Sequence, residues 1–456
     1  MQVIWSFGLG VFYAWFLAGN TLLADDWPQW LGPGRDAVWR ESGIVEKFPT
    51  NGPPVRWRAK IGGGYAGPSV AQGRVYVADR RLAPGTSNPA DPFAPGVVSG
   101  FERVLCLNEA DGEVLWQYEY ECPYHISYPA GPRVMPQVSQ GKVYTLGAEG
   151  NLCCLDAVGG KLLWSHDFKK EFGIKAPMWG FAGHPLVDGN RLICLVGGAG
   201  SVVVAFDKDS GKEVWRALSA EEPGYCSPVI YEAGGKRQLI LWHPEAANSL
   251  DPETGEVYWS VPFKSRAGMT LATPRKLGDL LFFTAFYSGS LMLRLDSAKP
   301  AAATVWRTQK VSEMETTHLN AVMCTPFLEL TYTANAGWDG YIYGVCSYGQ
   351  LRCLKMETGE RIWQTLQATT SGEPVRWANA FIVKNGNRFF LFNEKGDLII
   401  AKLSPRGYEE ISRAHLLEPI NKDCGRPVVW SHPAFANRHV YARNDKEIIC
   451  VDLAGR

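Results

Sequence analysis

The stretch Gly141–Trp164, GKVYTLGAEGNLCCLDAVGGKLLW, decides the fold of this 456-residue chain. Short runs of apolar and β-branched residues alternate in it with tight turns, and the turn from Asp156 to Gly160 leads into a run that contains Trp164. An Asp side chain can accept hydrogen bonds from the backbone N–H groups of its turn, and Gly supplies the positive φ that closes it. The stretch therefore predicts consecutive strands joined by hairpin turns.

The second turn recurs along almost the whole sequence as Asp or Asn, three residues, Gly, Lys or Glu, two residues and Trp. Four clear copies and two weaker ones end at Trp116, Trp164, Trp215, Trp259, Trp306 and Trp363. These tryptophans are separated by 48, 51, 44, 47 and 57 residues, close to the period of a four-stranded propeller blade. One such sheet cannot cover its own apolar faces, so the copies must stack radially.

A proline introduces the first strand of most copies, at Pro68, Pro136, Pro185, Pro228, Pro274, Pro326 and Pro433. Ala380 takes the position where the pattern predicts an eighth. The wider gap after Pro68 is explained by an insertion, Arg81–Gly100, rich in Pro, Gly and Ala, which should form a surface loop. We therefore predict an all-β, eight-bladed β-propeller of four-stranded antiparallel blades over residues 55–456.

The two ends of the chain complement each other. The last copy, Ile448–Arg456, stops within the turn and has no strand bearing Trp, whereas Val55-Arg56-Trp57 is a spare strand of that kind. We expect the N-terminal strand to complete the last blade, because this pairing closes the ring and removes its exposed edges.

The N-terminal region is expected to direct export. Residues 1–24 are mostly apolar and resemble a signal peptide, although Met1-Gln2 carries no basic residue and Leu22-Leu23-Ala24 fits the cleavage rule only in part. An uncleaved anchor is the alternative, and only then would the protein be attached to a membrane. Residues 25–54 are expected to form an irregular segment that wraps over a surface. We expect a periplasmic or extracellular monomer.

The charge balance argues against a nucleic-acid-binding protein, and the cysteines argue against a disulfide-stabilised one. Lys plus Arg equals Asp plus Glu, at 46 each, so no net field attracts nucleic acid. Eleven cysteines cannot all pair within one chain. Several occupy equivalent strand positions, where a free cysteine serves as a small buried apolar residue rather than as part of a disulfide framework: Cys106, Cys154, Cys353 and Cys450.

The repeats resemble the pyrroloquinoline-quinone (PQQ) repeat family, whose repeat reads Ala-or-Cys-Leu-Asp-x-x-x-Gly-Lys-x-x-Trp. Cys154-Leu155-Asp156 and Ala205-Phe206-Asp207 begin close copies of it. Trp27-Pro28-Gln29-Trp30 and Ser127-Tyr128-Pro129-Ala130-Gly131-Pro132-Arg133 resemble an exported subgroup common in planctomycetes and related bacteria. The resemblance implies the propeller fold but little about chemistry, because the family contains both enzymes and non-catalytic scaffolds.

In the quinoprotein alcohol dehydrogenases of this family, PQQ lies in the central funnel on a tryptophan, beneath a ring formed by two adjacent disulfide-bonded cysteines. Cys153-Cys154 is such a pair, but a vicinal disulfide would distort the strand that contains it. The family's calcium is held by Glu, Asn and Asp, and an Asp acts as base. Asn320 is present, but the nearest acids do not complete that arrangement: Glu221, Glu222, Glu315 and Asp339. We therefore predict neither a metal site nor a catalytic residue, and PQQ with calcium stays an alternative.

The residues ahead of the repeated prolines should ring the central funnel, because the chain crosses its rim just before each innermost strand. They include Tyr65, Arg133, Trp179, Tyr225, His318, Asn320, Arg376, Trp377, Arg426, Trp430 and His432. A basic and aromatic ring suits an anionic or planar ligand, since Arg forks grip carboxylates and rings stack on planes. Alternatively, these side chains only fill a wet channel.

These observations predict a non-catalytic scaffold that binds a ligand or a protein. Two alternatives remain open: a PQQ-dependent alcohol dehydrogenase, and a scaffold for protein assembly in the cell envelope.

Overall fold

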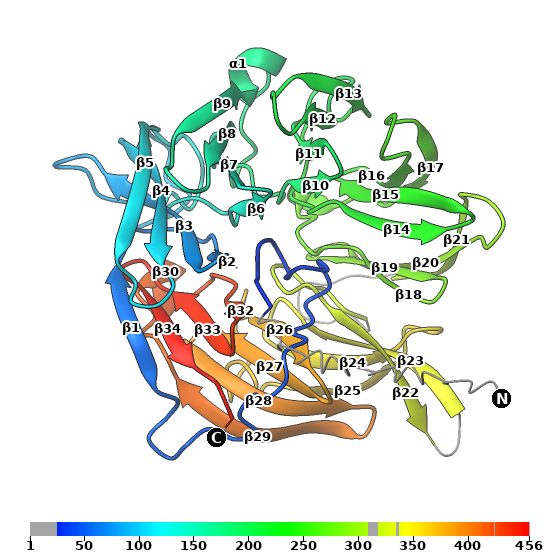
Figure 1. The fold of residues 1–456 in the computed structure, drawn as a ribbon. Coiled ribbons are helices and arrows are strands. Elements are labelled where there is room, and N and C mark those ends of the chain that lie inside the picture. The colour runs from blue at the N-terminus through cyan, green and yellow to red at the C-terminus, as the bar shows by residue number, and fades with distance from the viewer. Residues whose placement is uncertain (1–24, 309–317, 334–336, 424, 456) are drawn as a thin grey trace, which may run out of the picture.

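The computed structural model describes residues 25–308, 318–333, 337–423 and 425–455, and folds them into eight four-stranded antiparallel sheets around a central axis (Figure 1). Within each of the first seven sheets the strands pair in chain order. The first strands of neighbouring blades lie beside one another, as β2 does with β6 and β32, so they surround the axis. The predicted eight-bladed propeller is confirmed.

The first four blades contain β2 (Ser69–Ala71), β3 (Arg74–Leu82), β4 (Gly100–Asn108) and β5 (Val114–Glu121); β6 (Gln137–Ser139), β7 (Lys142–Leu146), β8 (Asn151–Asp156) and β9 (Leu162–Asp167); β10 (Leu186–Asp188), β11 (Arg191–Leu195), β12 (Val203–Asp207) and β13 (Glu213–Ala217); and β14 (Val229–Ala233), β15 (Lys236–His243), β16 (Ala246–Leu250) and β17 (Val257–Pro262).

The other four contain β18 (Arg275–Leu277), β19 (Leu280–Ala285), β20 (Gly289–Leu295) and β21 (Ala302–Arg307); β22 (Phe327–Thr333), β23 (Gly337–Val345), β24 (Leu351–Lys355) and β25 (Arg361–Thr365); β26 (Ala380–Asn385), β27 (Arg388–Asn393), β28 (Asp397–Ser404) and β29 (Gly407–His415); and β32 (Ala434–Ala436), β33 (His439–Arg443), β34 (Glu447–Asp452) and β1 (Val55–Lys60).

Three further elements lie between strands of these blades: α1 (Phe168–Phe172), the 3₁₀ turn η1 (Arg266–Gly268), and a small hairpin of β30 (Asn421–Asp423) and β31 (Arg426–Val428). The predicted insertion is the loop between β3 and β4. No described helix is long and apolar enough to cross a membrane. The predicted signal, residues 1–24, lies outside the described residues.

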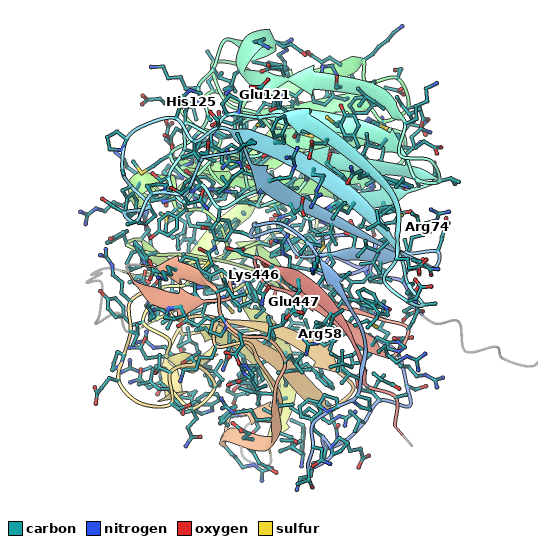
Figure 2. All side chains as sticks on the ribbon, turned by 90° about the vertical axis from the view of Figure 1, so that its left-hand side faces the viewer. Arg58, Arg74, Glu121, His125, Lys446 and Glu447 are labelled. Carbon is teal, nitrogen blue, oxygen red and sulfur yellow. The ribbon has the colours of Figure 1, made fainter. Side chains whose placement is uncertain are left out.

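The N-terminal strand closes the last blade, as predicted. β1 pairs antiparallel with β34, and the seam carries an ion pair between Arg58 Nη1 and Glu447 Oε1 at 3.0 Å (Figure 2). Trp57 supplies the missing tryptophan, and its Nε1 donates to the carbonyl of Glu109 in the first blade at 2.8 Å. The first and last blades are therefore joined by a hydrogen bond from a tryptophan to a turn carbonyl, which also joins other pairs of neighbouring blades.

That contact explains the repeated Gly and Trp. Trp116 donates from Nε1 to the carbonyl of Ala157 at 3.1 Å, in the turn of the following blade. In the same turn Gly160 has φ 70°, and a Cβ there would lie 2.5 Å from the ring of Trp116. Gly is required because it alone combines the left-handed backbone with so close an approach. Equivalent pairs are Trp57 with Gly112, Trp164 with Gly211 and Trp215 with Gly255.

Residues 25–54 are irregular, as the sequence suggested. They do more than wrap over a surface, because part of the segment is buried. Trp27 and Trp39 are each 1% exposed. The segment contacts first strands on opposite sides of the ring, through the backbone of Val70, Val138 and Lys384 and the side chain of Arg275. It therefore crosses the axis and closes one end of the central channel, where it is dark blue in Figure 1.

The ten described cysteines are all free and buried. Cys153 and Cys154 follow each other in β8 and belong to different core clusters, as alternation along a strand requires. The adjacent pair is thus part of two interblade cores, in agreement with the prediction that it forms no disulfide. Cys424 lies outside the described residues.

Candidate functional site

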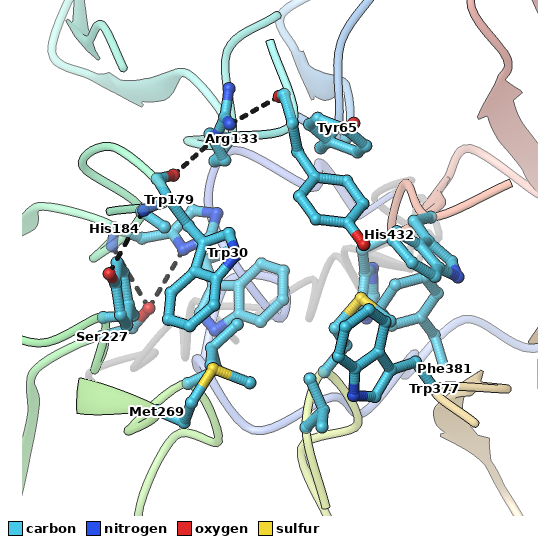
Figure 3. Close-up of a pocket in the computed structure, with 18 residues that line it drawn as sticks. Trp30, Tyr65, Arg133, Trp179, His184, Ser227, Met269, Trp377, Phe381 and His432 are labelled. Carbon is cyan, nitrogen blue, oxygen red and sulfur yellow. Dashed lines mark hydrogen bonds between the residues drawn. The ribbon is translucent and has the colours of Figure 1, made fainter. Parts of the chain in front are cut away.

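A cavity of about 180 Å³ lies at the centre of the ring, above the N-terminal segment (Figure 3). Eight of its lining residues are aromatic: Trp30, Tyr65, Tyr128, Trp179, Tyr225, Trp377, Phe381 and Trp430. The others are Gly67, Arg133, Ala182, His184, Ser227, Met269, Leu271, Val322, Met323 and His432. None of these described lining residues is a carboxylic acid.

Seven of the eleven residues predicted for the funnel line this cavity: Tyr65, Arg133, Trp179, Tyr225, Trp377, Trp430 and His432. The other four, His318, Asn320, Arg376 and Arg426, are not lining residues. The proline rule thus locates most of the wall, because the segments that enter the first strands converge on the axis.

Two of those four are packed elsewhere. His318 lies against Trp306, with ring centroids 4.7 Å apart, and its Nδ1 lies 2.7 Å from Thr308 Oγ1. Asn320 is 1% exposed, and its side-chain N and O have no hydrogen-bond partner among the described residues. Neither side chain is available as a wall of the cavity.

The other two flank the cavity from behind its rings. The guanidinium of Arg376 lies over the ring of Trp377, 4.6 Å from its centroid, and contacts the hydroxyl of Tyr287. Arg426 forms ion pairs with Glu394 and Asp423. Both arginines therefore support the aromatic wall from outside.

The floor comes from the N-terminal segment. Trp30 is partly buried, and its ring stacks on His184 with centroids 4.1 Å apart and planes inclined by 17°. Its Nε1 donates to Thr273 Oγ1 at 2.9 Å. The ring of His432 packs edge-on against the ring of Trp30, with centroids 5.0 Å apart. Sequence reasoning missed both Trp30 and His184, although His184 precedes Pro185 just as His432 precedes the last repeated proline.

Both histidines of the cavity are held neutral by burial. Burial lowers the pKa of His184 well below its usual value, and nearby Arg35 adds to this effect. Burial also lowers the pKa of His432, to about 4. His184 Nδ1 lies 3.0 Å from Ser227 Oγ, and His432 Nδ1 lies 2.6 Å from the carbonyl of Pro433. At neutral pH neither ring brings charge to the cavity.

Arg133 is the one cation among the described lining residues. Its guanidinium donates to backbone carbonyls, at 2.9 Å to Trp179, 2.9 Å to Ser127 and 2.7 Å to Tyr128, and also to Gly131. No described carboxylate forms an ion pair with it. The guanidinium of Arg133 is therefore the one fixed charge among the described lining residues.

A buried acidic network lies behind the rings on one side. Trp430 donates from Nε1 to Glu394 Oε2 at 3.1 Å, and Tyr128 donates to Asp423 Oδ1 at 2.9 Å. Arg426 contacts both carboxylates. Burial raises the pKa of Glu394 to about 6, against the lowering by Arg426. The two acids orient wall residues and are not themselves lining residues.

Two wall residues have an unusual backbone. Tyr128 has φ 55° and Trp377 has φ 62°, in the left-handed region that bulky side chains rarely adopt. Such strain persists where the surrounding structure imposes it, and it clusters at binding sites. The indole Nε1 of Trp377 is also buried without a partner among the described residues, as is Nε2 of His184.

The described residues do not fit PQQ with calcium. Calcium needs six or more oxygen ligands, usually with several carboxylates, and no described lining residue is acidic. No described group of three or more His, Cys, Asp or Glu is arranged to hold a metal ion. Asp339 forms an ion pair with Lys355, and Glu221 and Glu222 are not lining residues. Glu315 lies outside the described residues.

Comparison with known proteins places the repeats in one family. A family model described as "Outer membrane protein assembly factor BamB" matches residues 100–365, more than half of the chain.

Two kinds of relatives match parts of the sequence. BamB of Salmonella typhimurium is 24% identical over 257 residues, which are 50% of this chain and 62% of that protein. Quinohemoprotein alcohol dehydrogenase ADH IIB of Pseudomonas putida is 28% identical over 182 residues, 37% of this chain and 24% of the relative. The match thus spans less than two thirds of either relative.

Solved structures show the same fold at low identity. BamB from Moraxella catarrhalis has a TM-score of 0.51 and 16% identity, over 87% of this chain and 97% of that one. Quinohemoprotein alcohol dehydrogenase from Comamonas testosteroni has a TM-score of 0.58 and 14% identity, over 94% and 81%. These likenesses concern the fold alone.

Proposed function

The chain belongs to the PQQ-like repeat propeller family, and from this premise we propose that it is an exported, non-catalytic scaffold that binds a small planar ligand in its central cavity. One observation carries the proposal: eight aromatic side chains surround a cavity with a closed floor, and no described acid lines it. Such a site offers stacking faces and N–H donors. It offers no described carboxylate as a calcium ligand or as a base for hydride abstraction.

The floor gives the most direct test. We expect calorimetry to detect binding of an indole-sized aromatic probe to the wild-type protein, and Trp30→Ala to abolish it, because the ligand would stack on that ring. Trp338→Ala is the matched control, since Trp338 is 70% exposed on β23 and is not a lining residue. Absence of binding, or equal binding by Trp30→Ala, would contradict the proposal.

The similarity to quinohemoprotein alcohol dehydrogenases favours a second candidate, a PQQ-dependent dehydrogenase. When bound, PQQ would supply the hydride-accepting chemistry. The test is to add PQQ and calcium and to follow dye reduction with primary alcohols. Turnover under these conditions would refute the non-catalytic scaffold.

The description of the family model favours a third candidate, a scaffold for protein assembly in the envelope. A surface suited to protein contact exists on the hairpin of β22 and β23. There Tyr332 and Trp338 are 63% and 70% exposed, with ring centroids 5.7 Å apart. A defined envelope protein that co-purifies with wild type and is lost from Trp338→Ala would support this candidate over a small-molecule role.

A further inference from the structure

We propose that the cavity wall contains a pH-sensitive switch, in which protonation of Glu394 opens a closed chain of contacts and loosens Trp430. This inference rests on the proposed function, because it adds regulation to the same site, but its first test needs no ligand.

The chain of contacts begins and ends at two rings of the wall. Glu394 accepts from Trp430 Nε1 at 3.1 Å and forms an ion pair with Arg426. Arg426 Nη2 also lies 2.9 Å from Asp423 Oδ2, and Asp423 Oδ1 accepts from the hydroxyl of Tyr128 at 2.9 Å. The rings of Tyr128 and Trp430 close the chain, with centroids 6.0 Å apart. Both rings line the cavity, so a change at Glu394 acts directly on the wall.

Glu394 is placed where its negative charge is costly. It is buried, as is Asp423, and each is 4% exposed. The charged groups that face Glu394 from neighbouring elements are Arg426 of β31 and Asp423 of β30. Two carboxylates therefore share one guanidinium, which leaves one buried negative charge uncompensated. Burial raises the pKa of Glu394 to about 6, and Asp423 adds to this against the lowering by Arg426. Glu394 thus takes up a proton between neutral pH and pH 5.

Two other cations near this network engage different groups. The guanidinium of Arg376 lies over the ring of Trp377, 4.6 Å from its centroid. Lys395 follows Glu394 in the chain and donates from Nζ to the carbonyl of Thr370 at 2.7 Å. In the described part of the chain neither cation forms an ion pair with Glu394, so neither replaces the pairing that a proton removes.

Protonation weakens both bonds that Glu394 accepts. A hydrogen bond to a carboxylate is roughly twice as strong as one to a neutral acceptor, and the ion pair with Arg426 is lost. Arg426 keeps Asp423 as its partner, so the remaining charges are still paired. The indole N–H of Trp430 loses much of its anchor. The wall at Trp430 is therefore fixed at neutral pH and loosened at pH 5.

The change is local and does not require unfolding. The pKa of Glu394 is raised from the usual 4.5 in the folded protein, so the folded state binds this proton more readily than the unfolded chain does. Protonation of Glu394 thus does not destabilise the fold as the pH falls from about 6 to 4.5. The histidines of the cavity stay largely neutral at pH 5, because burial lowers the pKa of His432 to about 4 and that of His184 well below its usual value.

Fluorine NMR of the full chain labelled with fluorotryptophan measures the switch without a ligand, and Trp430→Phe identifies the resonance of Trp430. We expect this resonance to titrate in wild type with a midpoint near pH 6. In Glu394→Gln it should stay close to its acid position at every pH, because glutamine resembles the protonated acid. The resonance of Trp338, which is 70% exposed, is the control and should not titrate. A Trp430 resonance that does not change with pH in wild type would overturn the proposal.

The variant Asp423→Asn tests whether the two carboxylates share the guanidinium. It removes the neighbouring negative charge and leaves Arg426 to Glu394 alone, so the midpoint of the Trp430 resonance should fall by about 0.5 pH unit or more. A purely structural role of Asp423 would not move the midpoint in this direction. An unchanged or higher midpoint would therefore refute the shared pairing on which the switch depends.

Calorimetry with indole at pH 7.5 and pH 5 connects the switch to the proposed function. We expect wild type to bind indole about fivefold more weakly at pH 5, and Glu394→Gln to bind it weakly at both pH values. Equal binding by wild type at both pH values would show that the wall does not regulate the site, and the inference fails. If indole binds at neither pH, the proposed function fails, while the titration of Trp430 still decides whether the wall responds to pH.

Discussion

The indole of Trp30 lies against the imidazole of His184, with ring centroids 4.1 Å apart and planes inclined by 17°. Trp30 belongs to the irregular N-terminal segment, and His184 precedes the first strand of the third blade. The contact therefore joins a part of the chain without repeats to the repeating ring, and it forms the base of the cavity.

Removal of this ring should affect stability as well as binding. We expect Trp30→Ala to lower the free energy of unfolding by about 2 kcal/mol, less than for a fully buried tryptophan because Trp30 is only partly buried. Urea unfolding followed by circular dichroism measures the change. Trp338→Ala should stay within about 0.5 kcal/mol of wild type, and an equal loss in both variants would show that Trp30 does not anchor the floor.

The blade contact predicts unequal effects for two glycines with almost the same backbone. Gly160 and Gly141 have φ 70° and 75°, but a Cβ at Gly160 would lie 2.5 Å from Trp116, whereas nothing lies within 4 Å at Gly141. Gly141→Ala should cost about 1 kcal/mol of backbone strain. Gly160→Ala should cost about 3 kcal/mol, since overpacking adds to it. Thermal melts compare the two, and equal costs would contradict the interblade role of the glycine.

Closure of the ring predicts a strong effect of the N-terminal strand. Deletion of residues 55–60 removes β1 and its tryptophan contact, so we expect the melting temperature of the whole protein to fall by about 5 °C or more. Arg58→Ala removes only an exposed ion pair of the same seam and should cost less than about 1 kcal/mol. An unchanged melt after the deletion would refute closure by β1.

His432 predicts a loss of stability in acid. Its pKa is lowered from 6.5 to about 4 in the folded protein by burial, so the unfolded chain binds the proton more readily between these values. Stability from this group is therefore present above pH 6.5 and falls by about 3 kcal/mol as the pH drops to 4. Glu394 acts in the opposite sense, because its pKa is raised and its charged form is disfavoured in the folded protein.

The variant His432→Phe isolates this contribution, because Glu394 is present in both proteins. Unfolding free energies measured from pH 4 to pH 7 should fall less steeply toward acid in the variant than in wild type. Parallel pH profiles would show that His432 does not titrate between folded and unfolded states as proposed.

The ring was predictable because its determinants repeat. Trp116 and Gly160 have counterparts in other blades, and the spare strand at Trp57 matched the missing strand of the last repeat. The same regularity placed Trp179 and Trp430 on the axis, since both belong to segments that enter first strands.

Other parts of the site depended on contacts that leave no periodic mark. His318 has a funnel-entry position, yet Trp306 offers it a stacking surface between blades. Arg426 is drawn to two buried carboxylates behind the wall. Trp30 has no counterpart in any repeat, so spacing alone could not show that its segment crosses the axis.

The segment that carries Trp30 continues along the chain into β1, the strand that completes the last blade. One stretch of polypeptide thus both completes the last blade and forms the floor of the cavity. Separation of β1 from β34 would therefore also release the segment beneath the cavity. Because the cavity has its floor only while β1 is paired with β34, a ligand bound there would shift the equilibrium toward the closed ring.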